Sequence, residues 1–523
     1  MELTPTQLRK RMDYAWQQKA NWKSLYDEAY SYCLPQRNLY DGSWDSGTYG
    51  QQKGDQVFDS TAVHATQRFA NRIQSGIFPP DKKWMVLQPG VDITDEQEPV
   101  VRAACQTFTD KFFALLRQTN FDLAMGEMLM DLAVGTGAMM VQAGDGLNKL
   151  NFTPVPSFLL AFEEGPDGQV QNVYRKVKVS VENITATWRD AELSPELERM
   201  LEDSPQKHVT LDEATVYDRD DNQWRYYICY KSDEENSMLV MREMKRSVWV
   251  VSRFLKVPGE VMGRGVALSC LADIKTLNKT LELLLKNASI NIAGVYTAID
   301  DGVLNPQTIR IRPGAIIPVA RNGGPQGPSL QPIPRSGDIQ LAQVVISDLR
   351  QNIKQIMLDD SLPPDNMSAR SATEIVERMR QLATNISASF GRIITEAMVP
   401  LSRMVLEIME EQGIIDLPLK VDGLEIQIVP VSPIAQAQNL DEVQNVLQWL
   451  SISQQLGPAG VMTANLTAIS DYVASQLGVP EQLKTTEEER EQAMQVSQEM
   501  MAMQQAAAGP VDPGAPPPGA PAQ

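Results

Sequence analysis

The sequence predicts an α+β protein in which helices predominate and one sheet-rich region interrupts them. Apolar residues recur at helical spacing over long stretches before residue 136 and after residue 262. From about residue 138 to 255 the pattern changes to short runs of β-branched and aromatic residues bounded by turn residues. Residues 485–523 form a low-complexity ending that has little to bury, so we expect a disordered tail there.

Composition excludes several classes of protein. With 523 residues and 43% hydrophobic content, the chain is long enough for about two to four domains with buried cores. Its net charge of −19 opposes a uniform attraction to DNA or to anionic lipid. The four cysteines lack metal-site spacing, and we expect them to be buried free thiols in a reducing compartment. No signal peptide or membrane span is expected.

The N-terminal half should contain several helices followed by strands. Apolar spacing predicts helix over residues 4–34, and Ser60 is placed to cap a helix that stops before the next Pro-Pro pair. Residues 97–136 predict one or two further helices, whereas "WMVLQP" and "GAMMVQAG" predict strands. In "VYDRDDNQWRYYICY" the polar centre predicts a hairpin turn near residues 220–222.

Three helices dominate the C-terminal half. The first, within residues 262–291, places apolar residues on one face and charged residues on the other. The apolar face consists of Leu271, Ile274, Leu277, Leu281 and Leu284, and the charged face of Asp273, Lys275, Lys279, Glu282 and Lys286. A second helix is expected at 337–358, and a third begins near residue 372, where Pro400 should kink or split it. The Pro- and Gly-rich residues 292–336 predict a small insertion of strands and turns.

Few side chains have a spacing that suits catalysis. The two histidines, His64 and His208, have no partner at the spacing of a metal site or catalytic triad. No P-loop motif is present, and the glycine pairs of "VGTGA" and "MGRGV" lack the third glycine of a dinucleotide loop. We expect the glycines at 135, 137, 263 and 265 to serve helix ends and turns, and no cofactor to bind.

One acidic cluster leaves an alternative open. Glu163, Glu164 and Asp167 could hold a divalent ion, as in a metal-dependent enzyme. The surrounding "FEEGPDGQV" also has the turn chemistry of a solvated hairpin tip, and we favour the hairpin.

A polar loop, "MLDDSLPPDNMSARSATEI", separates the second and third of the long helices. Asp359 and Asp360 end the second helix, and the following Pro-Pro pair forbids its continuation. Ser371 with Glu374 matches the S-x-x-E capping box that begins the third helix. Any helical hairpin could use such a connector, so a plain connecting role is one interpretation.

The segment 262–340 has the opposite charge to the whole chain, with eight basic and five acidic residues. Its basic residues are Arg264, Lys275, Lys279, Lys286, Arg310, Arg312, Arg321 and Arg335. In a symmetric ring, each such residue would be repeated around the axis as a band of charge.

Five stretches occur in an order that is typical of one family. They are "RFANRIQSGIFPPDKKWMVLQP", "DLAVGTGAMMV", "GRGVALSCLADIKTLNKTLELLLK", "SARSATEIVERMRQ" and "VPLSRMVLEIM", within residues 5–430. In these stretches the chain resembles the portal, or head-tail connector, proteins of short-tailed phages (podophages). The resemblance implies a phage portal fold with wing, stem, clip and crown regions, assembled as a dodecameric ring.

The regions implied by this resemblance follow one another along the chain. They are a wing at 1–261, a first stem helix at 262–291, a clip at 292–336, a second stem helix at 337–358, a tunnel loop at 359–371, a long wing helix and strand at 372–432, crown helices at 433–484 and the tail at 485–523.

The resemblance also implies a function and partners. The ring would occupy the unique capsid vertex of the virion, and double-stranded DNA would pass through its channel during packaging and ejection without sequence-specific contacts. Terminase and the tail adaptor would dock on it, and capsid and scaffolding proteins would contact it during assembly in the host cytoplasm. No enzymatic activity or membrane contact is implied. The implied channel residues are the stem and clip basic residues named above and, in the tunnel loop, Asp359, Asp360, Asp365 and Arg370.

A different structural or scaffolding virion protein, built on a coiled coil, is the other alternative. Gly391 and Pro400 interrupt the heptads of the longest helix and count against it.

Overall fold

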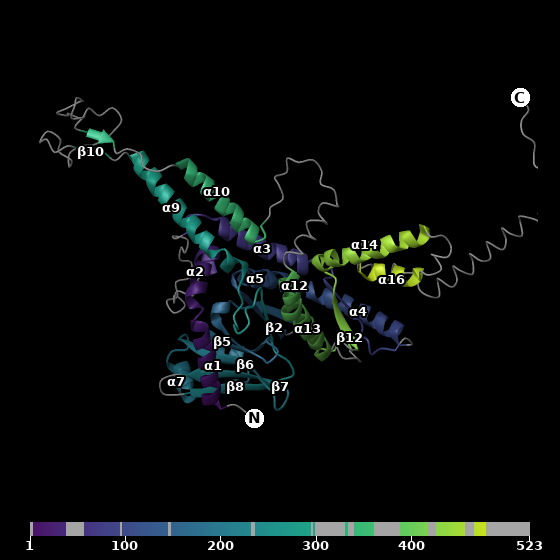
Figure 1. The fold of residues 1–523 in the computed structure, drawn as a ribbon. Helices are drawn as coiled ribbons and strands as arrows, with labels where there is room; N and C mark the ends of the chain where they lie inside the picture. The colour runs from purple at the N-terminus through teal and green to yellow at the C-terminus, as the bar shows by residue number, and fades with distance from the viewer. Residues whose placement is uncertain are drawn as a thin grey trace, which may run out of the picture. The chain divides into compact units, whose positions relative to one another are not determined.

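The structure is a computed structural model. It describes residues 4–37, 57–94, 97–144, 148–231, 236–293, 296–298, 330–332, 339–359, 387–416, 425–455 and 465–476. The chain divides into two compact units, Met1–Ala435 and Gln436–Gln523. Figure 1 shows the elements of both units.

Helices predominate among the described residues. The α-helices are α1 (Pro5–Ala20), α2 (Lys23–Cys33), α3 (Thr61–Ile77), α4 (Glu98–Leu116), α5 (Phe121–Val134), α6 (Ile184–Thr187), α7 (Pro195–Asp203), α8 (Val266–Ser269), α9 (Leu271–Ala293), α10 (Ile339–Ile356), α12 (Ser387–Ile393), α13 (Val399–Glu411), α14 (Pro433–Gln455) and α16 (Leu466–Gln476). The strands are β1 (Met85–Pro89), β2 (Thr136–Ala143), β3 (Leu150–Pro154), β4 (Leu160–Glu164), β5 (Val170–Ser180), β6 (His208–Asp218), β7 (Gln223–Lys231), β8 (Asn236–Met244), β9 (Trp249–Arg253), β10 (Tyr296–Ala298), β11 (Leu330–Pro332) and β12 (Ile426–Pro430). The predicted α+β class is confirmed.

Most strands belong to two antiparallel sheets. One has the order β4-β5-β6-β7-β8 and the other the order β3-β2-β9, so the sheet-rich region predicted at about 138–255 is confirmed. The predicted hairpin turn joins β6 to β7, where Asp218 pairs with Gln223 and Asn222 adopts a φ of 53°. Strand β1 pairs with the distant β12, and β10 pairs with β11.

Helices cover both faces of the five-stranded sheet. On one face, Leu8 and Met12 of α1 pack against Tyr227. On the other face, Trp188 and Leu197 pack in a cluster that contains the next strand residue, Ile228. Because successive strand residues point to opposite faces, β7 contributes to both clusters.

The predicted helix over residues 4–34 is present as two helices. Near the end of α1, the buried Lys19 donates from Nζ to the carbonyl oxygens of Ser157, Phe158 and Leu160 at 2.6, 2.7 and 2.6 Å. Burial and the nearby Lys176 lower the pKa of Lys19. The chain changes direction after α1 because α1 packs on the sheet, whereas α2 packs against α3 and α5.

Proline shapes the third long helix as predicted. Pro400 has no N–H to donate to the carbonyl of Glu396, and the helix widens just before it into a π-helical turn, η4 (Ile394–Met398). In this turn the N–H of Val399 donates to the carbonyl oxygen of Ile394, five residues earlier. Residues 372–386, the predicted start of this helix, and the tail at 485–523 lie outside the described residues.

Three glycines allow the backbone before α9 to touch the end of α5. A Cβ at Gly263 would lie 2.6 Å from the carbonyl oxygen of Gly135 and 2.8 Å from the Cβ of Arg253. The Gly265 N–H donates to the Val134 carbonyl oxygen at 2.9 Å. The prediction that glycines 135 and 265 serve a helix end and a turn is thus confirmed, whereas Gly137 lies inside β2.

The substitution Gly263→Ala should destabilise the protein by about 2–3 kcal/mol, because an added methyl group overpacks a rigid backbone contact. Gly391→Ala is the matched control, since Gly391 is helical and a Cβ there has no atom within 4 Å. The control should be neutral or stabilising by up to about 1 kcal/mol. Denaturant unfolding of both variants measures this, and equal effects would contradict the backbone-contact argument.

Candidate functional site

Helices α9 and α10 lie side by side and antiparallel, and the pair extends away from the sheets (Figure 1). Their apolar residues near the sheets join the main hydrophobic core. The buried members are Ile274, Leu277, Ile346, Ile353 and Met357, whereas the buried Leu271 packs in a second cluster. Leu281 and Leu284 are only partly buried against this core, so the predicted apolar stripe of α9 is confirmed and becomes less buried along its length.

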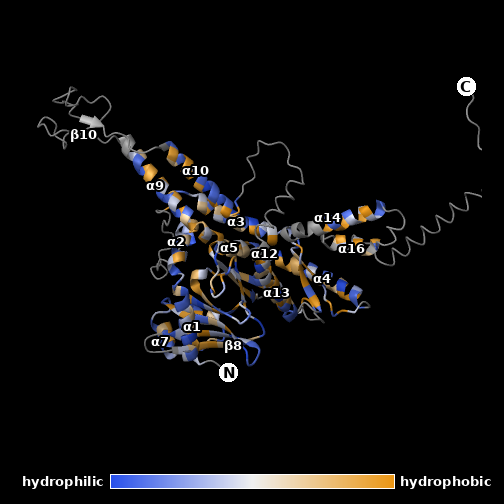
Figure 2. Ribbon diagram, in the orientation of Figure 1, coloured by the Kyte–Doolittle hydropathy of each residue, from blue (hydrophilic) through white to orange (hydrophobic). Residues whose placement is uncertain are grey.

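The same two helices also expose large apolar side chains. The exposed fractions are 55% for Leu283, 50% for Leu285, 63% for Leu341 and 57% for Val344. Figure 2 shows apolar and polar residues alternating along both helices. Leu341 and Val344 are three residues apart and lie on the same face of α10, which we call the exposed α10 face. Large exposed apolar side chains on one face of a helix mark an interaction surface more often than a free one.

The segment before α3 ties α9 to α10. The Asn278 side-chain oxygen of α9 accepts hydrogen bonds from the backbone N–H groups of Phe58 and Asp59 at 2.9 and 3.0 Å. Asp59 Oδ2 in turn accepts from Arg350 of α10, at 2.9 Å from Nε and 2.7 Å from Nη2. Asp59 Oδ1 also accepts from the N–H of Thr61 at 2.8 Å, so Asp59, and not the predicted Ser60, supplies the capping side chain of α3.

The charge on Asp59 is stabilised by these partners. Burial acts to raise the pKa of Asp59, but the hydrogen bonds from Thr61 and Arg350 outweigh it and hold the pKa below its usual value. The carboxylate is therefore ionised at neutral pH and binds Arg350 as a charged pair.

Helix α10 ends against α3. Arg68 Nη1 donates to both carboxylate oxygens of Asp359 at 3.1 Å, and Arg72 Nη1 donates to the carbonyl oxygen of Leu358. The side chain of Asp359 is 3% exposed. In the described subunit Asp359 is therefore buried and paired within its own chain, and the expectation that it lies in a channel stays a prediction.

The basic residues of α9 are exposed, and acidic residues accompany them. Lys275 lies 2.9 Å from Glu28, and Lys279 lies 3.0 Å from Glu282, which Lys286 also contacts. The other predicted channel residues, Asp360, Asp365, Arg370, Arg310, Arg312, Arg321 and Arg335, lie outside the described residues.

A buried arginine that the sequence did not single out joins the sheets to the π-helical turn. The Arg253 side chain is 0% exposed, and its Nη2 lies 2.7 Å from Glu396 Oε1. Its Nη1 contacts Glu164, which also pairs with Lys256 at 2.7 Å. Burial acts to lower the pKa of Arg253, but Glu396 and Glu164 raise it, so the guanidinium stays charged. An arginine at the end of an apolar strand gives no local pattern that predicts this pairing.

The three acids considered as a metal site do not converge. Glu163 accepts from Arg11 at 2.9 Å, Glu164 pairs with Arg253, and Asp167 accepts from the turn N–H of Gln169 at 3.1 Å. They belong to the predicted hairpin between β4 and β5, which is confirmed. Among the described residues, no group of three or more His, Cys, Asp or Glu is placed to hold a metal.

Other candidate groups are also structural. Cys33, Cys105, Cys229 and Cys270 are free and buried, as predicted, and burial raises the pKa of each thiol. Both histidines are exposed, His208 on β6 and His64 on α3. Within the part of the chain that the structure describes, no helix has the length and apolar character needed to span a bilayer.

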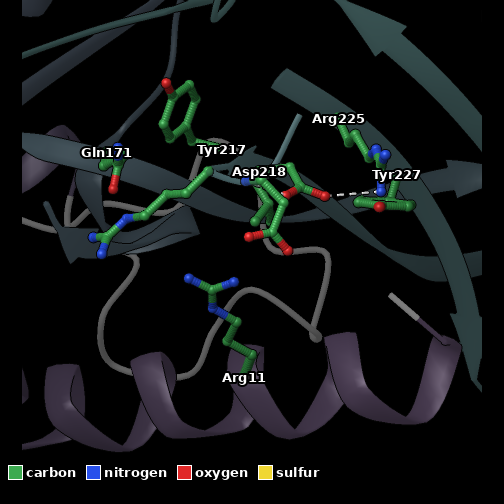
Figure 3. Close-up of a pocket in the computed structure, with 9 residues that line it drawn as sticks. Arg11, Gln171, Tyr217, Asp218, Arg225 and Tyr227 are labelled. Carbon is green, nitrogen blue, oxygen red and sulfur yellow. Dashed lines mark hydrogen bonds and ion pairs between the residues drawn. The ribbon is translucent and has the colours of Figure 1, made fainter. Parts of the chain in front are cut away.

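A hollow of about 430 Å³ lies between α1 and the β6–β7 turn. Figure 3 shows Arg11 extending from α1 towards this turn and Asp218 joined to Arg225. Arg225 Nη1 lies 2.9 Å from Asp218 Oδ2, and Arg11 Nε lies 2.9 Å from Glu163 Oε2. Because both arginines already have acidic partners, the hollow gives no support for an anion site.

The described residues thus include an antiparallel pair of helices, α9 and α10, that exposes large apolar side chains. A family model for the bacteriophage head to tail connecting protein matches residues 5–484. The chain belongs to this family. The portal resemblance seen in the sequence is thereby confirmed.

Individual relatives of this connector protein are distant. The portal protein of Escherichia phage T7 is 21% identical over 264 residues, which are 50% of this chain and 48% of that protein. The match therefore spans about half the length of that curated relative. Two solved structures align at 12% identity: a virion of a native gene transfer agent particle, with a TM-score of 0.35, and the neck of an empty gene transfer agent particle, with a TM-score of 0.33. The first alignment covers 81% of this chain and 90% of that chain, and the second covers 84% and 98%. At these TM-scores neither alignment supports a conclusion about the connector.

Replacing Asp59 with Ala should destabilise the connector by about 2–3 kcal/mol, because it removes a helix cap and leaves Arg350 without its buried partner. Arg102→Ala is the control, since Arg102 and Glu98 form an exposed pair one turn apart on α4. The control should cost less than about 0.5 kcal/mol. Urea unfolding compares the two, and a loss at Asp59 no larger than the control would refute its anchoring role.

Proposed function

We propose that this connector assembles as a closed ring of twelve subunits at one capsid vertex and forms a channel for double-stranded DNA. The family match over residues 5–484 is the observation that carries the proposal. The exposed α10 face supports it, because in a ring each subunit would cover the apolar side chains of its neighbour.

The charge of α9 suits a passage that must not hold DNA. Lys275, Lys279 and Lys286 each lie beside a glutamate, so they gain little from contact with phosphate groups. Firm phosphate contacts release counterions and bind DNA strongly, and each would have to break as the duplex moves. Paired lysines would guide the duplex without sequence preference and without trapping it.

The remaining roles follow from the family and belong to the same proposal. Residues 359–371 would form the tunnel loop, with Asp360, Asp365 and Arg370 near the DNA. Asp359, the first residue of the loop, would be fixed to α3. The clip at 292–336, including Arg310, Arg312, Arg321 and Arg335, would dock terminase and then the tail adaptor. The protein would act as a structural, non-catalytic part of the virion, assembled with capsid and scaffolding proteins in the host cytoplasm.

Light scattering after size exclusion should give a mass of about 700 kDa, as expected for twelve chains of 58.1 kDa. The double substitution Leu341→Asp and Val344→Asp should reduce the assembled fraction at least tenfold, because charge would replace the apolar side chains of the exposed α10 face. Tyr14→Asp is the control, as Tyr14 is 59% exposed on α1. A wild-type chain that stays monomeric at high concentration would refute the ring, and a variant that assembles normally would refute this interface.

Shortening the segment between Asp360 and Arg370 should leave the ring intact and impair the packaging or retention of DNA, because the proposed loop meets the duplex and not the neighbouring subunit. Negative-stain images report the ring, and nuclease-protected DNA in assembled particles reports packaging. Loss of the ring on shortening would show that the segment is structural and the channel role wrong.

A further inference from the structure

The last turn of α10 ends in a backbone conformation that leucine disfavours. Leu358 adopts a φ of 57°, the left-handed region that glycine usually occupies at helix ends. The Asp359 N–H donates to the Lys354 carbonyl oxygen at 2.7 Å, and the Leu358 N–H donates to the Gln355 carbonyl oxygen at 3.1 Å. These two bonds are those of a Schellman cap with leucine in the glycine position.

Two arginines of α3 contact this cap from outside. Arg68 and Arg72 are four residues apart and therefore lie on the same face of α3. Arg68 binds the buried Asp359 carboxylate, and Arg72 donates to the carbonyl oxygen of Leu358 itself. Both contacts require Leu358 to keep its left-handed conformation, because a helical Leu358 would turn its carbonyl and the following side chain elsewhere.

The sequence beyond the cap permits a longer helix. Asp360 and Ser361 impose no backbone bar to helix, and Leu362 is the first residue that disfavours it, because it precedes Pro363. Additional backbone hydrogen bonds favour the longer helix, whereas acids near a helix C-terminus oppose it. Local sequence alone does not decide whether α10 ends at the observed cap or extends towards Leu362, so contacts from α3 can select one of these two ends.

We propose that Arg68 and Arg72 are positioning residues that hold the end of α10 at Met357, and that without them α10 extends towards Leu362. Extension by one turn would carry the following residues about 5.4 Å along the helix axis. The functional consequence, that α3 sets where the tunnel loop begins, rests on the proposed channel function. The position of the helix end does not rest on it.

Hydrogen exchange with mass spectrometry on the full-length protein tests the inference. In Arg68→Ala, the amides of Asp360 to Leu362 should exchange about tenfold more slowly than in the wild type, because an extended α10 would place them in helical hydrogen bonds. The Arg102→Ala variant is the control and should exchange like the wild type there. Faster or unchanged exchange in Arg68→Ala would overturn the proposal, since it would show a frayed or indifferent helix end.

Two further variants separate a positioning role from lost packing. Leu358→Gly and Leu358→Ala remove the same side-chain contacts, but only glycine removes the steric penalty of the left-handed conformation. Added to Arg68→Ala, the glycine substitution should restore wild-type exchange, whereas the alanine substitution should not. Equal behaviour of the two double variants would refute the role of Leu358. Because the measurement needs neither DNA nor a ring, failure of the channel proposal would leave its result unchanged.

Discussion

The backbone contact between the end of α5 and the residues before α8 fixes where the α9–α10 pair begins. Gly263 and Gly265 lie too close to the α5–β2 junction for any side chain, so the direction of the chain entering α8 and α9 is set by main-chain atoms. Asn278 then fixes α9 to the segment before α3, and Asp59 of that segment binds Arg350 of α10. Each of these contacts depends on the preceding one, because a small rotation at the glycines would displace Asn278 from the backbone it binds.

Local patterns predicted the elements of this arrangement, and distant pairings were beyond their reach. The spacing of Leu271, Ile274 and Leu277 predicted the buried face of α9, and Pro400 predicted the distortion of the third helix. The partners Asp59 and Arg350 are 291 residues apart, and a single sequence contains no signal that joins them. For the same reason no sequence pattern indicated that Asp359, implied as a channel residue by the resemblance, is buried and paired with Arg68, which is also 291 residues away.

Electrostatics of the described chain favour internal pairing over a free basic surface. The segment containing α9 and α10 is locally basic in sequence, which suggested bands of positive charge. In the structure, the lysines of α9 lie beside Glu28 or Glu282, and Arg350 is held by Asp59. Since exposed pairs contribute little to stability, the lysine pairs matter more for the charge they neutralise than for the fold. In the proposed channel, the lysines of α9 would therefore not form a strongly basic patch.

Two ion pairs, each with a buried carboxylate, flank the part of the chain that runs from the end of α10 through α12. At one end, Arg68 holds Asp359 against α3. At the other end, Arg253 holds Glu396 in the π-helical turn, which exists because Pro400 cannot continue an ordinary helix. Removing one partner of such a pair leaves a buried charge uncompensated, so both attachments resist displacement. The two attachments therefore fix Asp359 and Glu396 to the same compact unit, Met1–Ala435.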